Sequence, residues 1–251
     1  MNQQTTVEQM HQLKVHGMAK LYQSISDQPV HQQPEPHTLV GMLTEAEIQT
    51  RLQQRTQLLL RLSKLRYHAM MEQVNATAQR GINKEQLLQF SDGLFISKGE
   101  NILITGSTGC GKSYLACALG RQSCMLGYRT MYLSMNRFIE SVANARLDGT
   151  YVKWLNQIAK TPLIILDDFG LQQLDHPMKL TLLQILEDRY AKGATIITSQ
   201  LPVKSWYEYI AEPTLADAIM DRLTAYAHKI ELKGESLRNK KILFLIKVRE
   251  H

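Results

Sequence analysis

The sequence predicts an α/β fold in which helices cover both faces of a parallel sheet. Three observations favour this class. The apolar run Ile102–Thr105 enters a glycine-rich turn, the apolar run Leu163–Leu166 ends in two aspartates, and strand-like and helix-like segments alternate over residues 101–199. Because parallel strands need a long crossover connection, usually a helix, this alternation indicates a parallel sheet rather than hairpins.

The expected elements follow one another along the chain. They are strand Ile102–Thr105, helix Lys112–Leu126, strand Arg129–Leu133, helices within Asn136–Ala159, strand Leu163–Asp167, helix Met178–Ala191, strand Thr195–Ser199 and a helix opened by Thr214 and Asp217. Gly127 and Gly193 stand where two of these helices should stop. We expect residues 71–251 to form this α/β domain and residues 1–70 to form a small N-terminal helical domain.

Length and composition are those of a globular protein. The chain has 251 residues, of which 44% are hydrophobic, and no apolar run is long enough to cross a membrane. Its N-terminus lacks a secretory signal, so we expect a cytoplasmic protein without a membrane partner. Cys110, Cys117 and Cys124 are spaced too widely along one helix face for a disulfide or a shared metal, which predicts buried packing residues.

Helical spacing dominates the first part of the chain. We expect a short amphipathic helix over Thr5–Ser24, a proline-containing connection, and a long helix that starts at Thr44 and runs to about Ala78. Thr44 and Glu47 fit a capping box at the start of that helix.

The long helix is basic. Two interpretations are equally open: a solvated face on a packing helix, or contacts to phosphates of duplex DNA. The candidate DNA-binding residues are Arg51, Arg55, Arg61, Lys64 and Arg66. The formal net charge is +6, and its placement matters more than its size. Basic patches of this kind suit phosphodiester backbones. A second basic group lies near the C-terminus and comprises Lys229, Lys233, Arg238, Lys240, Lys241, Lys247 and Arg249.

A second capping signal precedes the glycine-rich turn. Asn83 and Gln86 predict a helix through Phe90, after which Leu94–Ile96 leads to the first strand. We expect Leu94–Ile96 to lie near a bound nucleotide base.

The glycine-rich turn has the pattern G-x-x-x-x-G-K-[ST] of a phosphate-binding loop. Glycines allow successive backbone N–H groups to surround phosphate oxygens, the lysine binds the β- and γ-phosphates, and the serine hydroxyl can ligate Mg²⁺. The alternative, a simple connector before a helix, becomes improbable for the full pattern. The candidate nucleotide-binding residues are Gly106, Ser107, Thr108, Gly109, Cys110, Gly111, Lys112, Ser113 and Tyr114.

The aspartates after the second apolar run supply the other half of a nucleotide site. We expect Asp167 to bind Mg²⁺ opposite Ser113, and Asp168 to orient and deprotonate the attacking water. A plain strand end with a helix cap is the alternative. The glycine-rich turn, expected on a neighbouring strand, makes a catalytic pair the better interpretation.

Further polar residues could complete the site. Ser199 or Gln200 could sense the γ-phosphate, although polar residues also simply end strands. Arg222 or Arg238 could stabilise charge on the phosphate across a subunit contact, although most arginines lie on surfaces or in ion pairs.

Taken together, the motifs resemble the AAA+ ATPases, and in particular the IstB-like transposition helper proteins and the related DnaC-type helicase loaders. The resemblance covers most of the chain and rests on GSTGCGKS, LIILDDFG, ITSQLPVKSWYEYI, PTLADAIMDRL and IELKGESLR. It implies a Walker A loop at Gly106–Ser113, a Walker B pair at Asp167 and Asp168, sensor 1 at Ser199 or Gln200, an arginine finger at Arg222 and a sensor-2 arginine at Arg238. Asp168 departs from the commoner AAA+ glutamate and has a shorter reach.

The resemblance also implies a function. It predicts a Mg²⁺-dependent ATPase that self-assembles on duplex DNA, with ATP sites between subunits, and that assists a transposase encoded by the same insertion sequence. Two rivals stay open: a helicase loader, and an assembly switch that binds ATP with little hydrolysis. Arg189, in LEDRY, is a further candidate for the subunit boundary, and the tail ILFLIKVREH has no counterpart in the family pattern.

Overall fold

The computed structural model describes residues 2–237 and divides into two compact units. The N-terminal unit is Met1–Leu58 and the core unit is Leu59–His251. Arg238 and the ILFLIKVREH tail lie outside the described residues. Within the described part, no helix combines the length and the apolar character needed to cross a bilayer.

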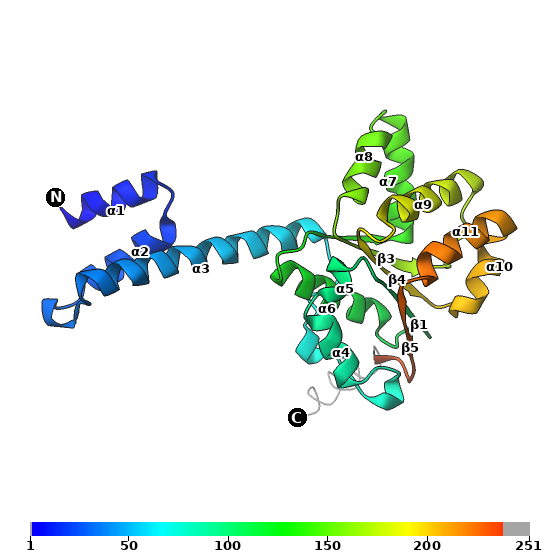
Figure 1. Cartoon of the computed structure of the whole chain (residues 1–251), viewed down its shortest axis with the longest axis horizontal. Coiled ribbons are helices and arrows are strands. Elements are labelled where there is room, and N and C mark those ends of the chain that lie inside the picture. The colour runs from blue at the N-terminus through cyan, green and yellow to red at the C-terminus, as the bar shows by residue number, and fades with distance from the viewer. Residues whose placement is uncertain (1, 238–251) are drawn as a thin grey trace, which may run out of the picture. The chain divides into compact units, whose positions relative to one another are not determined.

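The N-terminal unit is helical, with α1 (Gln3–Gln12), α2 (His16–Ser26), the 3-10 turn η1 (Val30–Gln32) and most of α3 (Pro36–Ser63) (Figure 1). The single helix expected over Thr5–Ser24 was wrong, because the chain breaks at Lys14, whose φ is 59°. The long helix was also misplaced: α3 begins at Pro36, where a first-turn proline is well tolerated, and ends at Ser63 before the left-handed Lys64.

The capping box expected at Thr44 and Glu47 does not form. Thr44 lies inside α3, where its hydroxyl donates to the carbonyl of Val40 at 2.9 Å. The Glu47 carboxylate instead accepts from the backbone N–H of Gly17 at 2.7 Å and of Met18 at 3.4 Å. It therefore satisfies free amides at the start of α2 rather than at the start of its own helix.

The core unit contains a five-stranded sheet and the helices around it. Its helices are α4 (Lys84–Ser91), α5 (Leu94–Ser97), α6 (Lys112–Met125), α7 (Met135–Leu147), α8 (Tyr151–Ala159), α9 (His176–Arg189), α10 (Trp206–Ile210) and α11 (Pro213–Thr224), with 3-10 turns η2 (Met71–Gln73), η3 (Ala78–Arg80) and η4 (Val203–Ser205). Its strands are β1 (Asn101–Gly106), β2 (Thr130–Ser134), β3 (Leu163–Phe169), β4 (Ala194–Ser199) and β5 (Ala227–Leu232). The capping box of Asn83 and Gln86 at the start of α4 is confirmed.

The sheet is parallel throughout, in the order β2-β3-β4-β1-β5. This order corrects one expectation: β4 lies between β1 and β3, so the strand with the aspartates is not adjacent to the strand that feeds the glycine-rich turn. The edge strand β5 was not predicted. Because all strands run the same way, Gly106, Asp167 and Ser199 lie on the same side of the sheet, where the strands have their carboxyl ends.

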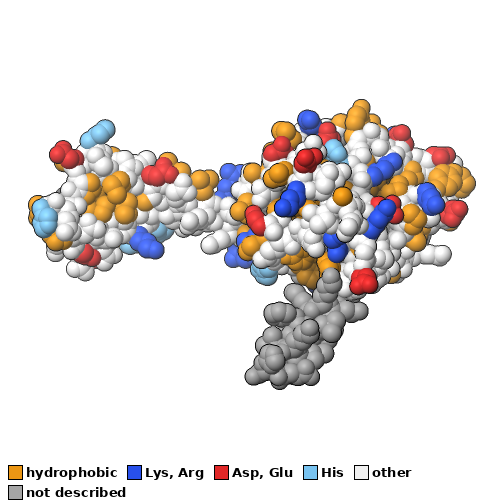
Figure 2. All heavy atoms as spheres, turned by 90° about the horizontal axis from the view of Figure 1, so that it is seen from below, with side chains coloured by type: hydrophobic (Ala, Val, Ile, Leu, Met, Phe, Trp, Pro, Cys, Tyr) orange, Lys and Arg blue, Asp and Glu red, His pale blue; other side chains and the backbone are white. Residues whose placement is uncertain are grey.

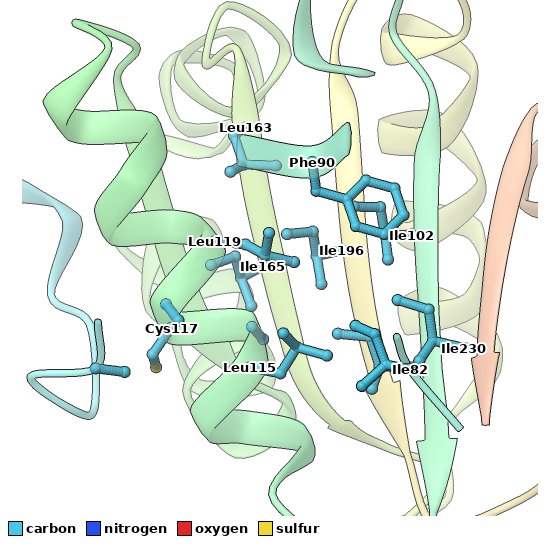
Figure 3. Close-up of a cluster of buried hydrophobic side chains, with 14 of the residues drawn as sticks. Ile82, Phe90, Ile102, Leu115, Cys117, Leu119, Leu163, Ile165, Ile196 and Ile230 are labelled. Atoms are coloured by element: carbon cyan, nitrogen blue, oxygen red, sulfur yellow. The ribbon is translucent and has the colours of Figure 1, made fainter. Parts of the chain in front are cut away.

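Alternating side chains of the strands pack into two separate apolar layers. Ile102 and Ile104 face α4–α6, whereas Leu103 faces α7–α11, and the two helix groups lie on opposite sides of the sheet in Figure 1. Figure 3 shows the first layer, in which Leu115 and Leu119 of α6 lie against strand residues. This two-faced burial confirms the predicted class.

The three cysteines are buried and free, as expected. The structure contradicts the expectation that Arg189 lies at a subunit boundary, because only 1% of this residue is exposed. Its guanidinium donates to the carbonyls of Ile158 at 2.8 Å and of Thr161 and Ala194 at 2.5 Å. Burial lowers the pKa of Arg189 to about 10, and the side chain ties the end of α8 to the start of β4.

Candidate nucleotide site

The loop from Gly106 to Gly111 leads from β1 into α6. Gly106, Gly109 and Gly111 have φ values of 145°, 83° and 100°, which L side chains rarely adopt. A Cβ on Gly106 would also lie 2.3 Å from the carbonyl oxygen of Leu232. The loop therefore needs glycine for conformation and for space, and it brings the first amides of α6 to the strand edge.

Lys112 and Ser113 form the first turn of α6. The Lys112 ammonium donates to the carbonyls of Gly106 and Ser107, both at 2.8 Å, so the side chain folds back over the loop. The Ser113 hydroxyl donates to Asp167 Oδ1 at 2.7 Å. This hydrogen bond joins the glycine-rich loop to the aspartate pair across the intervening strand β4.

Asp167 is fully buried at the end of β3. Besides the bond from Ser113, its carboxylate accepts short hydrogen bonds from the hydroxyls of Tyr132 and Thr198. Burial, together with the bond to Asp167 and the charge of that carboxylate, raises the pKa of Tyr132 strongly, so the phenol stays protonated as a donor. The hydroxyl and carboxylate oxygens of Ser113 and Asp167 are the hard ligands that Mg²⁺ prefers.

Asp168 lies at an irregularity of the sheet. The register between β3 and β4 shifts between Leu166 and Phe169, and Asp168 has a φ of 64°. In a regular strand, neighbouring side chains point to opposite faces, but a bulge re-aims one of them. Both carboxylates consequently come near one guanidinium: Arg66 Nη1 lies 3.6 Å from Asp167 Oδ2 and 3.5 Å from Asp168 Oδ2.

A pocket of about 680 Å³ opens beside the loop. Its lining includes Lys112, Ser113 and Asp168 from the predicted set. Leu94–Ile96, expected near the base, does not line it, because Phe95 and Ile96 are buried in the core. The segment before α4 lines the pocket instead, with Gln73, Val74, Asn75, Arg80 and Ile82.

Sequence reasoning missed Arg80 and Gln73. Arg80 Nη2 donates to the carbonyl of Cys110 at 2.6 Å, and Gln73 Oε1 accepts from the Tyr114 hydroxyl at 2.7 Å. Gln73 ends the 3-10 turn η2 and Arg80 ends η3, in the segment between α3 and α4. The sequence pattern instead predicts a long helix that continues to about Ala78. The Tyr114 contact keeps that predicted residue at the pocket wall.

The two sensor candidates differ in position. Ser199 is buried, and its hydroxyl donates to the carbonyl of Phe169 at 2.6 Å while accepting from the N–H of Leu201. Gln200 lines the pocket and accepts from the Thr108 hydroxyl at 2.8 Å. Gln200 is therefore the candidate that the structure brings to the phosphate loop.

Arg222 lies on α11, away from the pocket lining. It pairs with Asp221 at 2.9 Å and with Glu187 at 3.5 Å.

The candidate DNA-binding residues do not share one element. Arg51 pairs with Glu47 at 2.7 Å, Arg55 and Arg61 are exposed on α3, and Lys64 and Arg66 follow its end. Basic and acidic side chains are interspersed over the face shown in Figure 2.

Comparison with known proteins identifies the family. A family model described as IstB-like ATP binding protein matches residues 8–243. The chain belongs to this family. A member from Sinorhizobium fredii, described as the insertion sequence ATP-binding protein y4pL, is 39% identical over 93% of this chain and 95% of its own. A second, from insertion sequence IS1162 of Pseudomonas fluorescens, is 35% identical over 79% of this chain and 87% of its own.

Solved structures agree with the fold of an IstB-like protein. The crystal structure of DnaI covers 66% of this chain and 92% of its own with a TM-score of 0.56 at 21% identity. The DnaC helicase loader covers 66% of this chain and 98% of its own with a TM-score of 0.54 at 20% identity. The core unit is thus a P-loop AAA+ fold, as the sequence motifs predicted.

Proposed function

We propose that this IstB-like protein is a DNA-binding AAA+ ATPase that assembles with ATP on duplex DNA and assists a transposase encoded by the same insertion sequence. The observation that carries the ATPase assignment is the 2.7 Å hydrogen bond between Ser113 and Asp167. It places a P-loop hydroxyl and a strand-end carboxylate together, as a metal–nucleotide site requires. The names of the insertion-sequence relatives support the biological role.

Each residue of the proposed site has a separate role in binding or hydrolysing ATP. Loop amides and the Lys112 ammonium bind the phosphates, and Ser113 with Asp167 holds Mg²⁺, which would neutralise phosphate charge when bound. Asp168 orients the attacking water and accepts its proton. Gln200 lies beside Thr108 in the loop and is suited to contact the terminal phosphate.

Assembly supplies the remaining positive charge. Arg222 lies outside the pocket of its own chain, which suits a residue that reaches the nucleotide of a neighbouring copy in a homo-oligomer. Arg238 keeps its proposed sensor-2 role by family resemblance and lies outside the described residues. Hydrolysis then depends on contact between subunits, and Arg51, Arg55, Arg61 and Lys64 are the proposed phosphate contacts to DNA.

The test is ATP hydrolysis with and without duplex DNA. Lys112→Ala should lose nucleotide affinity, whereas Asp168→Asn should retain ATP and lose roughly a hundredfold or more in kcat, the usual scale for a general base. Arg129→Ala is a matched control, because Arg129 is exposed and precedes β2 at the opposite edge of the sheet. Unchanged ATP binding by Lys112→Ala would refute the assigned site.

The alternative is an assembly switch that binds ATP without turnover. The shorter reach of the Asp168 carboxylate, compared with the commoner AAA+ glutamate, favours it. If the wild-type protein binds ATP and assembles but releases no phosphate even with DNA, the protein is an assembly switch and not an ATPase. The helicase-loader alternative rests on fold alone.

A further inference from the structure

Arg66 was assigned to a DNA-binding face, yet its guanidinium lies in the nucleotide site. Nη1 is 3.6 Å from Asp167 Oδ2 and 3.5 Å from Asp168 Oδ2, and the residue lines the same pocket as Lys112 and Ser113. A single arginine thereby bridges the two acids, one buried and one 29% exposed.

The backbone around Arg66 is held firmly against α6. Ser63 and Ala69 are fully buried, and a Cβ on Gly120 would lie 2.9 Å from Leu65 Cδ2. Burial raises the pKa of the Cys117 thiol to about 11, against the effect of backbone hydrogen bonds from Tyr67 and Arg66. These contacts fix the base of the arginine side chain, as a positioning role requires.

Lys112, another cationic side chain that lines the pocket, contacts the loop backbone. The Lys112 ammonium donates to two loop carbonyls at 2.8 Å, an arrangement that suits a later bond to phosphate. Arg66, by contrast, faces the acids. The Asp168 carboxylate extends from a bulge with a left-handed φ of 64°, where the strand alone does not dictate its direction.

We propose that Arg66 is a positioning residue of the ATP site, which holds the Asp168 carboxylate in the orientation needed to activate water. The proposal rests on the proposed ATPase function and adds an arginine from the same chain to it. Arg66 is then distinct from Arg222, which acts on a neighbour's nucleotide. Arg66 lies three residues after the end of α3 at Ser63.

Steady-state kinetics provides the first test. Arg66→Ala should lower kcat roughly ten- to a hundredfold, the scale of a misplaced catalytic group, while KM for ATP changes little. Arg66→Lys should recover part of the loss because it restores the positive charge without the shape and reach of the guanidinium. Arg66→Gln provides a variant of similar length if the alanine protein does not fold, and Arg129→Ala is the control. An unchanged kcat in folded Arg66 variants would overturn the proposal.

A double-mutant cycle tests whether Arg66 acts through Asp168. In the Asp168→Asn background, Arg66→Ala should have little further effect on kcat, because the group it positions has already been altered. Full, independent losses in the double variant would overturn the proposal. A wild-type protein without turnover would refute the ATPase function as well, whereas turnover that ignores Arg66 would refute the inference alone.

DNA affinity separates the two interpretations of Arg66. Binding to a duplex of fixed sequence, measured across salt concentrations with a slowly hydrolysed ATP analogue, should have the same slope for wild type and Arg66→Ala. A phosphate contact would instead lower affinity and reduce the slope by about one. A reduced slope combined with normal kcat would return Arg66 to the DNA surface and overturn the proposal.

Discussion

The two units of the chain are stabilised in different ways. The core unit buries a parallel sheet on both faces, and its described buried polar side chains have hydrogen-bond partners, as Arg189 does. The described part of the N-terminal unit has few buried apolar residues, among them Ala19, Ile25 and Leu43, and the Glu47 carboxylate links α3 to the start of α2. Extensive burial fixes the strand ends that carry the candidate site in the core unit, whereas the N-terminal unit has much less buried apolar surface.

This contrast predicts the largest stability loss at Arg189. Arg189→Met removes the donors to several buried carbonyls that have no access to water, and we expect about 3 kcal/mol lower free energy of unfolding. Chemical denaturation followed by circular dichroism measures it. Arg129→Met, at an exposed arginine, should change stability by less than about 0.5 kcal/mol. If both variants lower the free energy of unfolding by the same small amount, the buried Arg189 network does not stabilise the core unit as proposed.

A smaller and pH-dependent loss is expected at Glu47. The Arg51 side chain and the amides of Gly17 and Met18 lower the pKa of this carboxyl below its ordinary value of 4.5. The stabilisation is therefore present above that value and lost as pH falls through the lowered pKa. Glu47→Gln should reduce amide protection in α2, and the difference from wild type should diminish in acid. Hydrogen exchange of α2 measures both; an equal loss in the core unit would argue against separate units.

The difference between the units also explains what the sequence could reveal. The apolar runs of β1, β3 and β4 and the fixed spacing of the phosphate loop identified the fold and its main site, because burial on both faces leaves an unambiguous pattern. The edge strand β5 was missed because only Ile230 and Leu232 are buried in it, whereas the consecutive His228 and Lys229 are both exposed and interrupt the alternation that marks a half-buried strand.

The missed parts of the site have a different cause. Arg66 follows the end of α3, and Arg80 ends the 3-10 turn η3. The sequence predicted that the long helix continues past Arg66, whereas packing against α6 and the loop sets the path of this segment. The bulge that brings the Asp168 carboxylate near Arg66 lies in the pairing of β3 with β4. Residue spacing alone does not predict such a contact between distant segments.

The smallest expected effect is at Thr44, and it tests the extent of the N-terminal unit's long helix. If α3 began at Thr44, replacing this N-cap with alanine would cost about 1 kcal/mol. Inside α3, as the bond from its hydroxyl to Val40 places it, Thr44→Ala should instead be neutral or stabilising by a few tenths of a kcal/mol, because alanine has the higher helix propensity. Hydrogen exchange along residues 36–44 measures the difference. Fast exchange before Thr44 in the wild-type protein, together with a less stable helix in Thr44→Ala, would mean that the helix starts at Thr44 and that this residue is its N-cap.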